Sequence, residues 1–221
     1  MDNNIESSFD AIPFYQKHPY MKPFIGERFD SELHKKLLIV GESHYLPATS
    51  TVHLNIDDWY AGNCDVSDEE KEWCNTRNSR KYGYGKIFQQ LIEGDLREHF
   101  GADFNDVASF NYFLRPSNKG KTFKKICNIK DRSASAENFY KVVEILKPDL
   151  IVFASKFVFD CIAWKNDYPN VYHEKFEEYA KRKNIEIVMT CHPSNGWWHR
   201  FYGEKTSSQI FVDFLRKYWL K

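Results

Sequence analysis

The sequence predicts an α/β protein, arranged as three α/β/α layers around a central, mostly parallel four-stranded sheet. Four short apolar runs, each followed by polar residues, are typical of strands buried on both faces of a parallel sheet. Helical patterns lie between these runs, and strands that alternate with helices favour parallel pairing. No internal repeat or linker interrupts the sequence, so residues 1–221 are expected to form one domain, with an N-terminal arm (1–34) and a long insertion (46–84).

The four expected strands begin where apolar residues become continuous and end where polar residues follow. They are Lys36–Val40, Asp106–Phe113, Asp149–Ala154 and Ile185–Thr190. The arm before the first strand contains several prolines and is expected to be irregular. The insertion after that strand has no clear periodicity, and loops of this length are commonly functional, for example as lids.

Five helices are expected from apolar residues at helical spacing and from residues that begin or end a helix. The clearest of them begins at Ser135, whose side chain is suited to capping, and stops before Pro148. The expected helices are Gly85–Phe100, Ser135–Lys147, Lys156–Trp164, Tyr172–Lys183 and Ser207–Leu220.

The composition limits the environment and the partners. The chain has 31 basic and 31 acidic side chains, so a nucleic acid would need a local basic patch. No apolar run is long enough for a membrane span, and the polar, acidic start of the chain does not resemble a secretory signal, so we expect a cytoplasmic protein without a membrane partner. The five cysteines have no C-x-x-C spacing, which favours reduced thiols over disulfides or a zinc ribbon.

Polar residues directly after three of the expected strands indicate a site. Because the carboxyl ends of parallel strands meet at one edge, Glu42, Ser43, Asn111 and His192 are expected to share a pocket. Gly41 permits a tight turn before them. The amide of Asn111 lies in an apolar strand and would cost about 1–3 kcal/mol if left unpaired. Either a pyrimidine edge or a neighbouring loop backbone would satisfy it.

Two further segments suggest contacts with nucleic acid. Seven basic residues and one acidic residue lie between Arg115 and Arg132, next to the expected pocket, which suits a phosphate backbone as well as it suits a solvated loop. Trp197 and Trp198 follow the His192 turn, and one of them could stack on a base or anchor the loop. The residues that we assign to nucleic-acid binding are Arg115, Lys119, Lys121, Trp197, Trp198 and Arg200.

Taken together, these runs resemble the uracil-DNA glycosylase superfamily, of which the chain looks like a divergent member. The resemblance covers roughly residues 36–200 and depends on the order and strand placement of four segments. They are Gly41–Tyr45, Phe110–Pro116, Leu146–Val152 and His192–Ser194.

The resemblance implies a reaction in which a base is flipped out of DNA and its N-glycosidic bond is hydrolysed. In that family the Asn reads the pyrimidine, the His stabilises the departing uracil anion, and an acidic or polar group positions water. Ser43 stands where the best-known branch has Asp, and Glu42 matches the Glu of other branches. The resemblance thus implies catalytic residues Glu42, Ser43 and His192, and substrate-binding residues Gly41, Tyr45, Asn111 and Ser194.

The implied partner is single- or double-stranded DNA, with or without uracil. No cofactor and no metal are expected, and an iron–sulfur cluster is not expected because C-x-x-C spacing is absent. Histidines, aspartates and a cysteine between residues 44 and 64 do not have a ligand spacing typical of metal sites. The sequence does not indicate the oligomeric state or the base that is recognised.

Two other functions remain open at this point. One is a catalytically weak or inactive module of the same fold that binds a nucleic acid or nucleotide. The other is a serine hydrolase in which His192 activates Ser43. Against the hydrolase, Met189 stands three residues before His192 where an Asp would be expected, and Tyr45 replaces the glycine of a nucleophile elbow.

Overall fold

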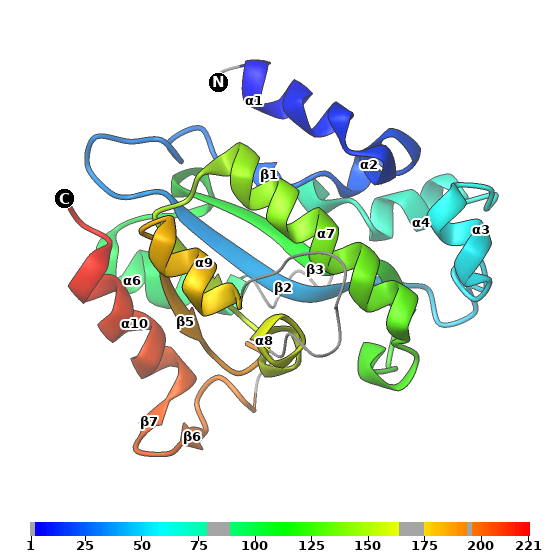
Figure 1. Cartoon of the computed structure of the whole chain (residues 1–221). Helices are drawn as coiled ribbons and strands as arrows, with labels where there is room; N and C mark the ends of the chain where they lie inside the picture. Colours follow the sequence, from blue (N-terminus) through cyan, green and yellow to red (C-terminus); the bar gives the residue numbers. More distant parts are fainter. Residues whose placement is uncertain (1–2, 79–88, 164–174, 194–195) are drawn as a thin grey trace.

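The main sheet has five strands in the order β1-β3-β2-β4-β5. Figure 1 labels β1, β2, β3 and β5 of this sheet. The structure is a computed structural model that describes residues 3–78, 89–163, 175–193 and 196–221. Strands β2 to β5 are parallel to one another, and β1 is antiparallel to β3. The α/β class and the mostly parallel sheet are confirmed, with five strands in place of four. The strands are β1 (Phe24–Ile25), β2 (Leu37–Leu46), β3 (Val107–Asn118), β4 (Leu150–Phe153) and β5 (Glu186–Met189).

The additional strand comes from the N-terminal segment, which was expected to be irregular. In β1, Phe24 pairs with Ser109 and Ile25 with Ala108, so the segment extends the sheet at the β3 edge. Short helices precede β1, and their Phe9 side chain is completely buried in the core. These helices are α1 (Asn3–Ser8), η1 (Phe9–Ala11), α2 (Pro13–Lys17) and η2 (Pro19–Met21).

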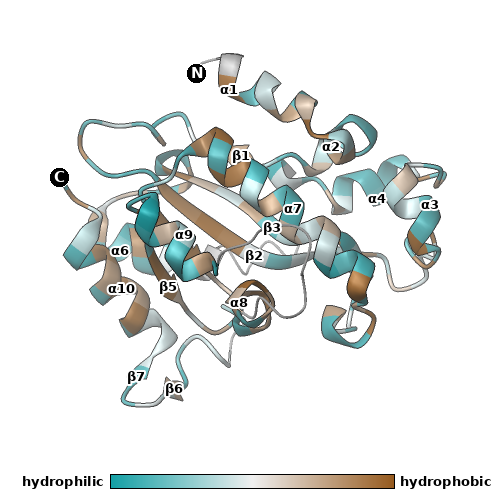
Figure 2. Cartoon of the chain, in the orientation of Figure 1, coloured by the Kyte–Doolittle hydropathy of each residue, from teal (hydrophilic) through white to brown (hydrophobic). Residues whose placement is uncertain are grey.

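Two of the parallel strands are longer than expected. The pairing of β2 with β4 ends at Val40 and Phe153, whereas its pairing with β3 continues to Leu46 and Asn118, with one register shift between Ser43 and Tyr45. Beyond Val40, β2 and β3 therefore form a two-stranded ribbon that extends past β4. Along β2, the first residues are hydrophobic and the residues of the ribbon are mostly hydrophilic (Figure 2). The expectation that the strand ends before the Gly41–Tyr45 motif is wrong, because the backbone ladder continues through it.

The helices lie largely where the pattern places them. Helix α7 begins before the predicted Ser135, because Asn128 forms a capping box with Asp131. Ser135 lies inside this helix, and its Oγ accepts a hydrogen bond from the Leu114 backbone N–H at 3.3 Å. Residues 85–88, Trp164 and 172–174 of the expected helices lie outside the described residues. The helices are α7 (Ile129–Leu146), α8 (Lys156–Ala163), α9 (Phe176–Arg182), α10 (Ser207–Tyr218), a π-helical segment (Gln89–Leu96) and α6 (Arg97–Phe100).

The insertion between β2 and the π-helical segment is partly helical. It contains α3, capped by Asn55, and α4, capped by Ser67. Trp59 of α3 is completely buried, and its Nε1 donates to the Leu114 carbonyl at 3.1 Å. The insertion therefore packs on β3. Its described elements are α3 (Ile56–Ala61), α4 (Asp68–Trp73) and a 3₁₀ turn (Thr76–Asn78).

Alternate residues of the strands belong to two different hydrophobic clusters, as expected for a sheet covered on both sides. Leu38 and Val40 of β2 belong to the cluster that includes side chains of α7, α8 and α9. Leu37 and Ile39 belong to the cluster that includes side chains of α10 and the π-helical segment. The described helices include none with the length and apolar character needed to cross a membrane.

Candidate functional site

The strand order reverses direction at β2. The chain passes from β2 to its neighbour β3, and then crosses to β4 on the opposite side of β2. In open α/β sheets, ligands bind at the carboxyl ends of the strands where such a reversal occurs. The last residues that pair between β2 and β4 are Val40 and Phe153, and Glu42 lies two residues beyond Val40. The topology therefore places Glu42 at the position where a ligand is expected.

The Glu42 carboxyl is half-buried and accepts one hydrogen bond. Ser155, between the end of β4 and the start of α8, donates from Oγ to Glu42 Oε2 at 2.7 Å. Burial raises the pKa of Glu42 above its ordinary value, while the Ser155 hydrogen bond and the Lys124 ammonium oppose this effect. No second side-chain hydrogen bond to this carboxyl is found among the described residues. Glu42 is therefore held in place and still has an oxygen with which to accept from a ligand or water.

Ser43 does not lie beside the Glu42 carboxyl. Successive side chains of a strand point to opposite faces, so Glu42 and Ser43 diverge. Ser43 is 7% exposed, and its Oγ has no hydrogen-bond partner among the described residues. Gly41 is the register partner of Asn111, which is half-buried, so these two residues lie side by side on β2 and β3. The strand residues that were expected to share one pocket are thus divided between the two faces of the ribbon.

The residues that follow Ser43 contribute to packing at the ribbon. His44 is 6% exposed, and burial lowers its pKa to about 4. Its Nε2 lies 3.4 Å from Thr76 Oγ1 of the insertion. Tyr45 is half-buried, and its carbonyl accepts a weak hydrogen bond from Cys74 Sγ at 3.9 Å. The insertion therefore packs against the end of β2.

His192 lies at the same edge of the sheet, just after β5. Its turn is attached to the fold by two hydrogen bonds, from Thr190 N to the Phe153 carbonyl at 2.9 Å and from Cys191 N to Ser207 Oγ at 2.9 Å. Burial lowers the pKa of His192 to about 4, so its imidazole is neutral at neutral pH. A neutral imidazole still has one N–H to donate to a developing anion. Ser194 lies outside the described residues.

Arg115 has a structural role in place of the predicted contact with nucleic acid. It is 2% exposed and forms two hydrogen bonds with Asp131, from Nε at 2.8 Å and from Nη2 at 2.6 Å. The Arg115 guanidinium also donates to the backbone carbonyls of Ile126 and His53. A phosphate cannot reach a guanidinium enclosed in this way, so this assignment is corrected. Lys119 and Lys121 are exposed.

The two adjacent tryptophans have different environments. Trp198 is completely buried, and its Nε1 donates to Asp95 Oδ2 at 2.6 Å, so it anchors the loop and cannot stack on a base. This corrects the prediction for Trp198. Trp197 is 56% exposed, and the Arg200 guanidinium lies 5.1 Å from the centre of its ring.

Sequence reasoning missed two exposed aromatics in the same loop. Phe201 is 73% exposed and Tyr202 is 46% exposed, and together they form β6 (Phe201–Tyr202), which pairs with β7 (Lys205–Thr206). We call residues 196–202 the aromatic loop. Its repeated aromatics beside Arg200 were a signal available in the sequence. The Lys156 ammonium, at the start of α8, lies close enough to Tyr202 and Cys191 to interact with their ionised forms, so the loop lies close to the edge that holds Ser155.

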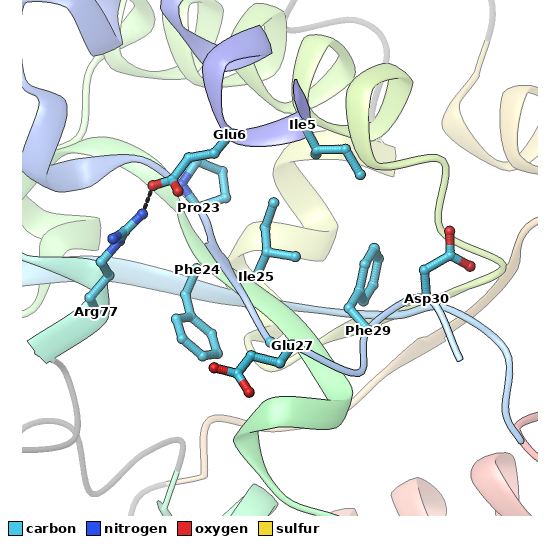
Figure 3. Close-up of a pocket in the computed structure, with 10 residues that line it drawn as sticks. Ile5, Glu6, Pro23, Phe24, Ile25, Glu27, Phe29, Asp30 and Arg77 are labelled. Atoms are coloured by element: carbon cyan, nitrogen blue, oxygen red, sulfur yellow. Dashed lines mark ion pairs between the residues drawn. The ribbon is translucent and has the colours of Figure 1, made fainter. Parts of the chain in front are cut away.

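A pocket of about 390 Å³ lies elsewhere, between α1 and β1 (Figure 3). Ile5, Ile25 and Phe29 contribute apolar lining, and Glu6 forms an ion pair with Arg77 at its side. Because β1 pairs with the first residues of β3, this pocket is not at the carboxyl edge of the sheet. It therefore does not coincide with the predicted site.

The described residues contain no cluster of three or more histidine, cysteine or acidic side chains that could hold a metal ion. The five cysteines are free thiols. No protein-family model matches the chain, and no curated protein matches it.

Proposed function

We propose that the protein is a DNA glycosylase, which hydrolyses the N-glycosidic bond of uracil or a related damaged base. The observation that carries this proposal is the Glu42 carboxyl at the reversal of strand order, held by Ser155 through one oxygen. Glu42 also belongs to the Gly41–Tyr45 segment that resembles a motif of uracil-DNA glycosylases, which adds support. The hydrophobic clusters on the two faces of the sheet support a three-layer α/β/α arrangement for this enzyme.

In the proposed reaction, Glu42 acts as the general base. Its carboxylate takes a proton from water as the water oxygen bonds to the anomeric carbon of the sugar. The bond from that carbon to the base nitrogen breaks, and the base leaves as an anion that is later protonated. Positioned proton transfer of this kind typically contributes about 10²–10⁴-fold in rate.

His192 and Asn111 act on the base. The neutral His192 donates its N–H to the departing anion, a role that does not require it to lose a proton. Asn111, the register partner of Gly41 on β3, reads the pyrimidine edge. Because Asn111 is the register partner of Gly41, its side chain shares the face of Ser43 and lies opposite that of Glu42, so the base and the attacking water would be held from the two faces of the ribbon.

The nucleic acid would contact the aromatic loop and the exposed lysines. Trp197 offers an exposed ring already stacked against Arg200, and stacking of a base on an aromatic side chain is worth about 1–3 kcal/mol. Lys119 and Lys121 are exposed cations on the segment that follows β3 and would contact phosphates. Because the chain as a whole has no net charge, these exposed lysines would provide the electrostatic attraction to the phosphates.

A second candidate is a binding module of the same fold without base release. Ser43 favours it, because a buried hydroxyl without a partner among the described residues cannot activate water. The same observation disfavours the serine hydrolase, because a nucleophilic serine needs a base within hydrogen-bond reach.

The test is base release from a labelled oligonucleotide carrying one uracil, single-stranded and opposite guanine. We expect N111A and H192A each to lower the single-turnover rate by about tenfold or more, which is about 1.4 kcal/mol in the barrier. The exposed residues Asn63 and His99 provide matched controls, N63A and H99A, which should retain the wild-type rate.

The alternatives give different results in the same experiments. Tight binding of the oligonucleotide without base release by the folded wild type would identify the binding module. Turnover of a small ester that is lost in S43A would identify the hydrolase.

A further inference from the structure

Ser155 is not part of the set of residues that the sequence indicates, yet its side chain donates a hydrogen bond to Glu42. It lies at the junction between β4 and α8, and it is 2% exposed. Its Oγ donates to Glu42 Oε2 at 2.7 Å and accepts from the backbone N–H of Val158 at 3.3 Å. The same hydroxyl thus caps the helix and holds the carboxyl.

We propose that Ser155 is a positioning residue that fixes the Glu42 side chain and keeps it ionised, with Oε1 directed to the attacking water. This inference rests on the proposed role of Glu42 as the general base. A hydroxyl group has a single proton to donate. Ser155 Oγ accepts from the Val158 N–H and donates its proton to the Glu42 carboxyl, and a carboxylate accepts such a bond better than a carboxylic acid does.

Lys124 reinforces the same effect from another element. Its ammonium lies 5.7 Å from the centre of the Phe157 ring on α8, and it is close enough to Glu42 to lower the pKa of that carboxyl. Ser155 and Lys124 are the groups among the described residues that act on Glu42 electrostatically. They oppose the effect of burial, which would otherwise favour the protonated form that cannot accept a proton from water.

The chain contains a matched control for this arrangement. Ser67, at the start of α4, donates from Oγ to Glu70 Oε2 at 2.8 Å and accepts from the Glu70 backbone N–H at 3.3 Å. Although burial raises the pKa of Glu70, hydrogen bonds from Ser50 and Ser67 hold it below its ordinary value. S67A therefore removes the same kind of capping hydroxyl without touching Glu42.

The first test measures the pKa of Glu42 by NMR titration of the full-length protein with ¹³C-labelled glutamate carboxyls, assigned with E42Q. In S155A, we expect the pKa of Glu42 to rise by about one unit or more, because a hydrogen bond to a charged group is lost. S155T keeps the hydroxyl and should restore the wild-type value. S67A should raise the pKa of Glu70 and leave that of Glu42 unchanged.

The second test measures the pH dependence of single-turnover base release in the same variants. The acidic limb of the profile should move upward in S155A by the shift seen for Glu42, and S155T should return it. S155G is the second variant in case S155A does not fold, because glycine is tolerated at the start of a helix.

An unchanged Glu42 pKa in both S155A and S155G would overturn the inference, as would an acidic limb that does not follow that pKa. If the wild-type protein releases no base, the proposed function fails, and the catalytic role of Ser155 fails with it. The titration would then still decide whether Ser155 holds the charge of Glu42, which separates the two failures.

Discussion

Two charged groups near the carboxyl ends of β2 and β3 differ in how completely the protein satisfies them. Arg115 and Asp131 are buried together, and their hydrogen bonds extend to Tyr60 and to two backbone carbonyls. Glu42 is half-buried and accepts from Ser155 through one oxygen. The first group is satisfied within the fold, and the second has capacity left for a ligand. Proximity to the expected site and a suitable charge are therefore not enough to assign a function.

The largest effect on stability should come from a change in the buried pair of Arg115 and Asp131. We expect D131N to lower the free energy of unfolding by about 3–5 kcal/mol, because Arg115 would be left as a buried charge without its partner. Urea denaturation followed by circular dichroism measures this. The exposed pair of Glu137 and Lys141 provides the control, and E137Q should change stability by less than about 0.5 kcal/mol. A loss below about 1 kcal/mol in D131N would contradict the structural role.

Trp198 and Trp197 also differ in how far the fold encloses them, because Trp198 is buried and Trp197 is exposed. W198F should lower the free energy of unfolding by about 1–3 kcal/mol, because the buried carboxylate of Asp95 loses its donor. W197A should leave stability within about 0.5 kcal/mol of the wild type and weaken binding of single-stranded DNA by about 1–3 kcal/mol. Denaturation and fluorescence anisotropy measure the two effects. Equal effects of both variants on stability would remove the distinction.

A smaller effect should appear in the pH dependence of stability. Burial lowers the pKa of His44 to about 4, below its ordinary value of about 6.5. Between these two pH values the unfolded chain takes up a proton that the folded protein does not, so stability falls as the pH is lowered through this window. Urea denaturation of H44N should show a flatter dependence from pH 6.5 to 4. A slope identical to that of the wild type would mean that His44 takes up its proton over the same pH range in the folded and unfolded states.

The sequence indicated the parallel strands because their starts are continuous apolar runs, such as Leu37–Val40. It did not indicate where β2 ends, since the backbone pairing from Gly41 to Leu46 depends on β3 as a distant partner. This extension separates Glu42 from Ser43, which a turn would have kept together. The strand β1 was missed because two residues are too few to show a period.

Some features of the site had local signals, and others did not. Asn128 followed by Asp131 is a capping box, which could have placed the start of α7 correctly. The pairing of Arg115 with Asp131 and of Ser155 with Glu42 joins residues far apart in the chain. Such contacts are set by tertiary packing, and no local pattern distinguishes a buried arginine from one that binds phosphate.

The central claim is that the Glu42 carboxyl, which accepts a hydrogen bond from Ser155 through one oxygen, carries the chemistry. It is tested most directly by single-turnover release of uracil from the oligonucleotide by the wild type, by E42Q and by the control E178Q, which changes an exposed glutamate of α9. We predict that the wild type and E178Q release uracil at the same rate and that E42Q is slower by about 10²-fold or more. Release by E42Q at the wild-type rate would contradict the claim.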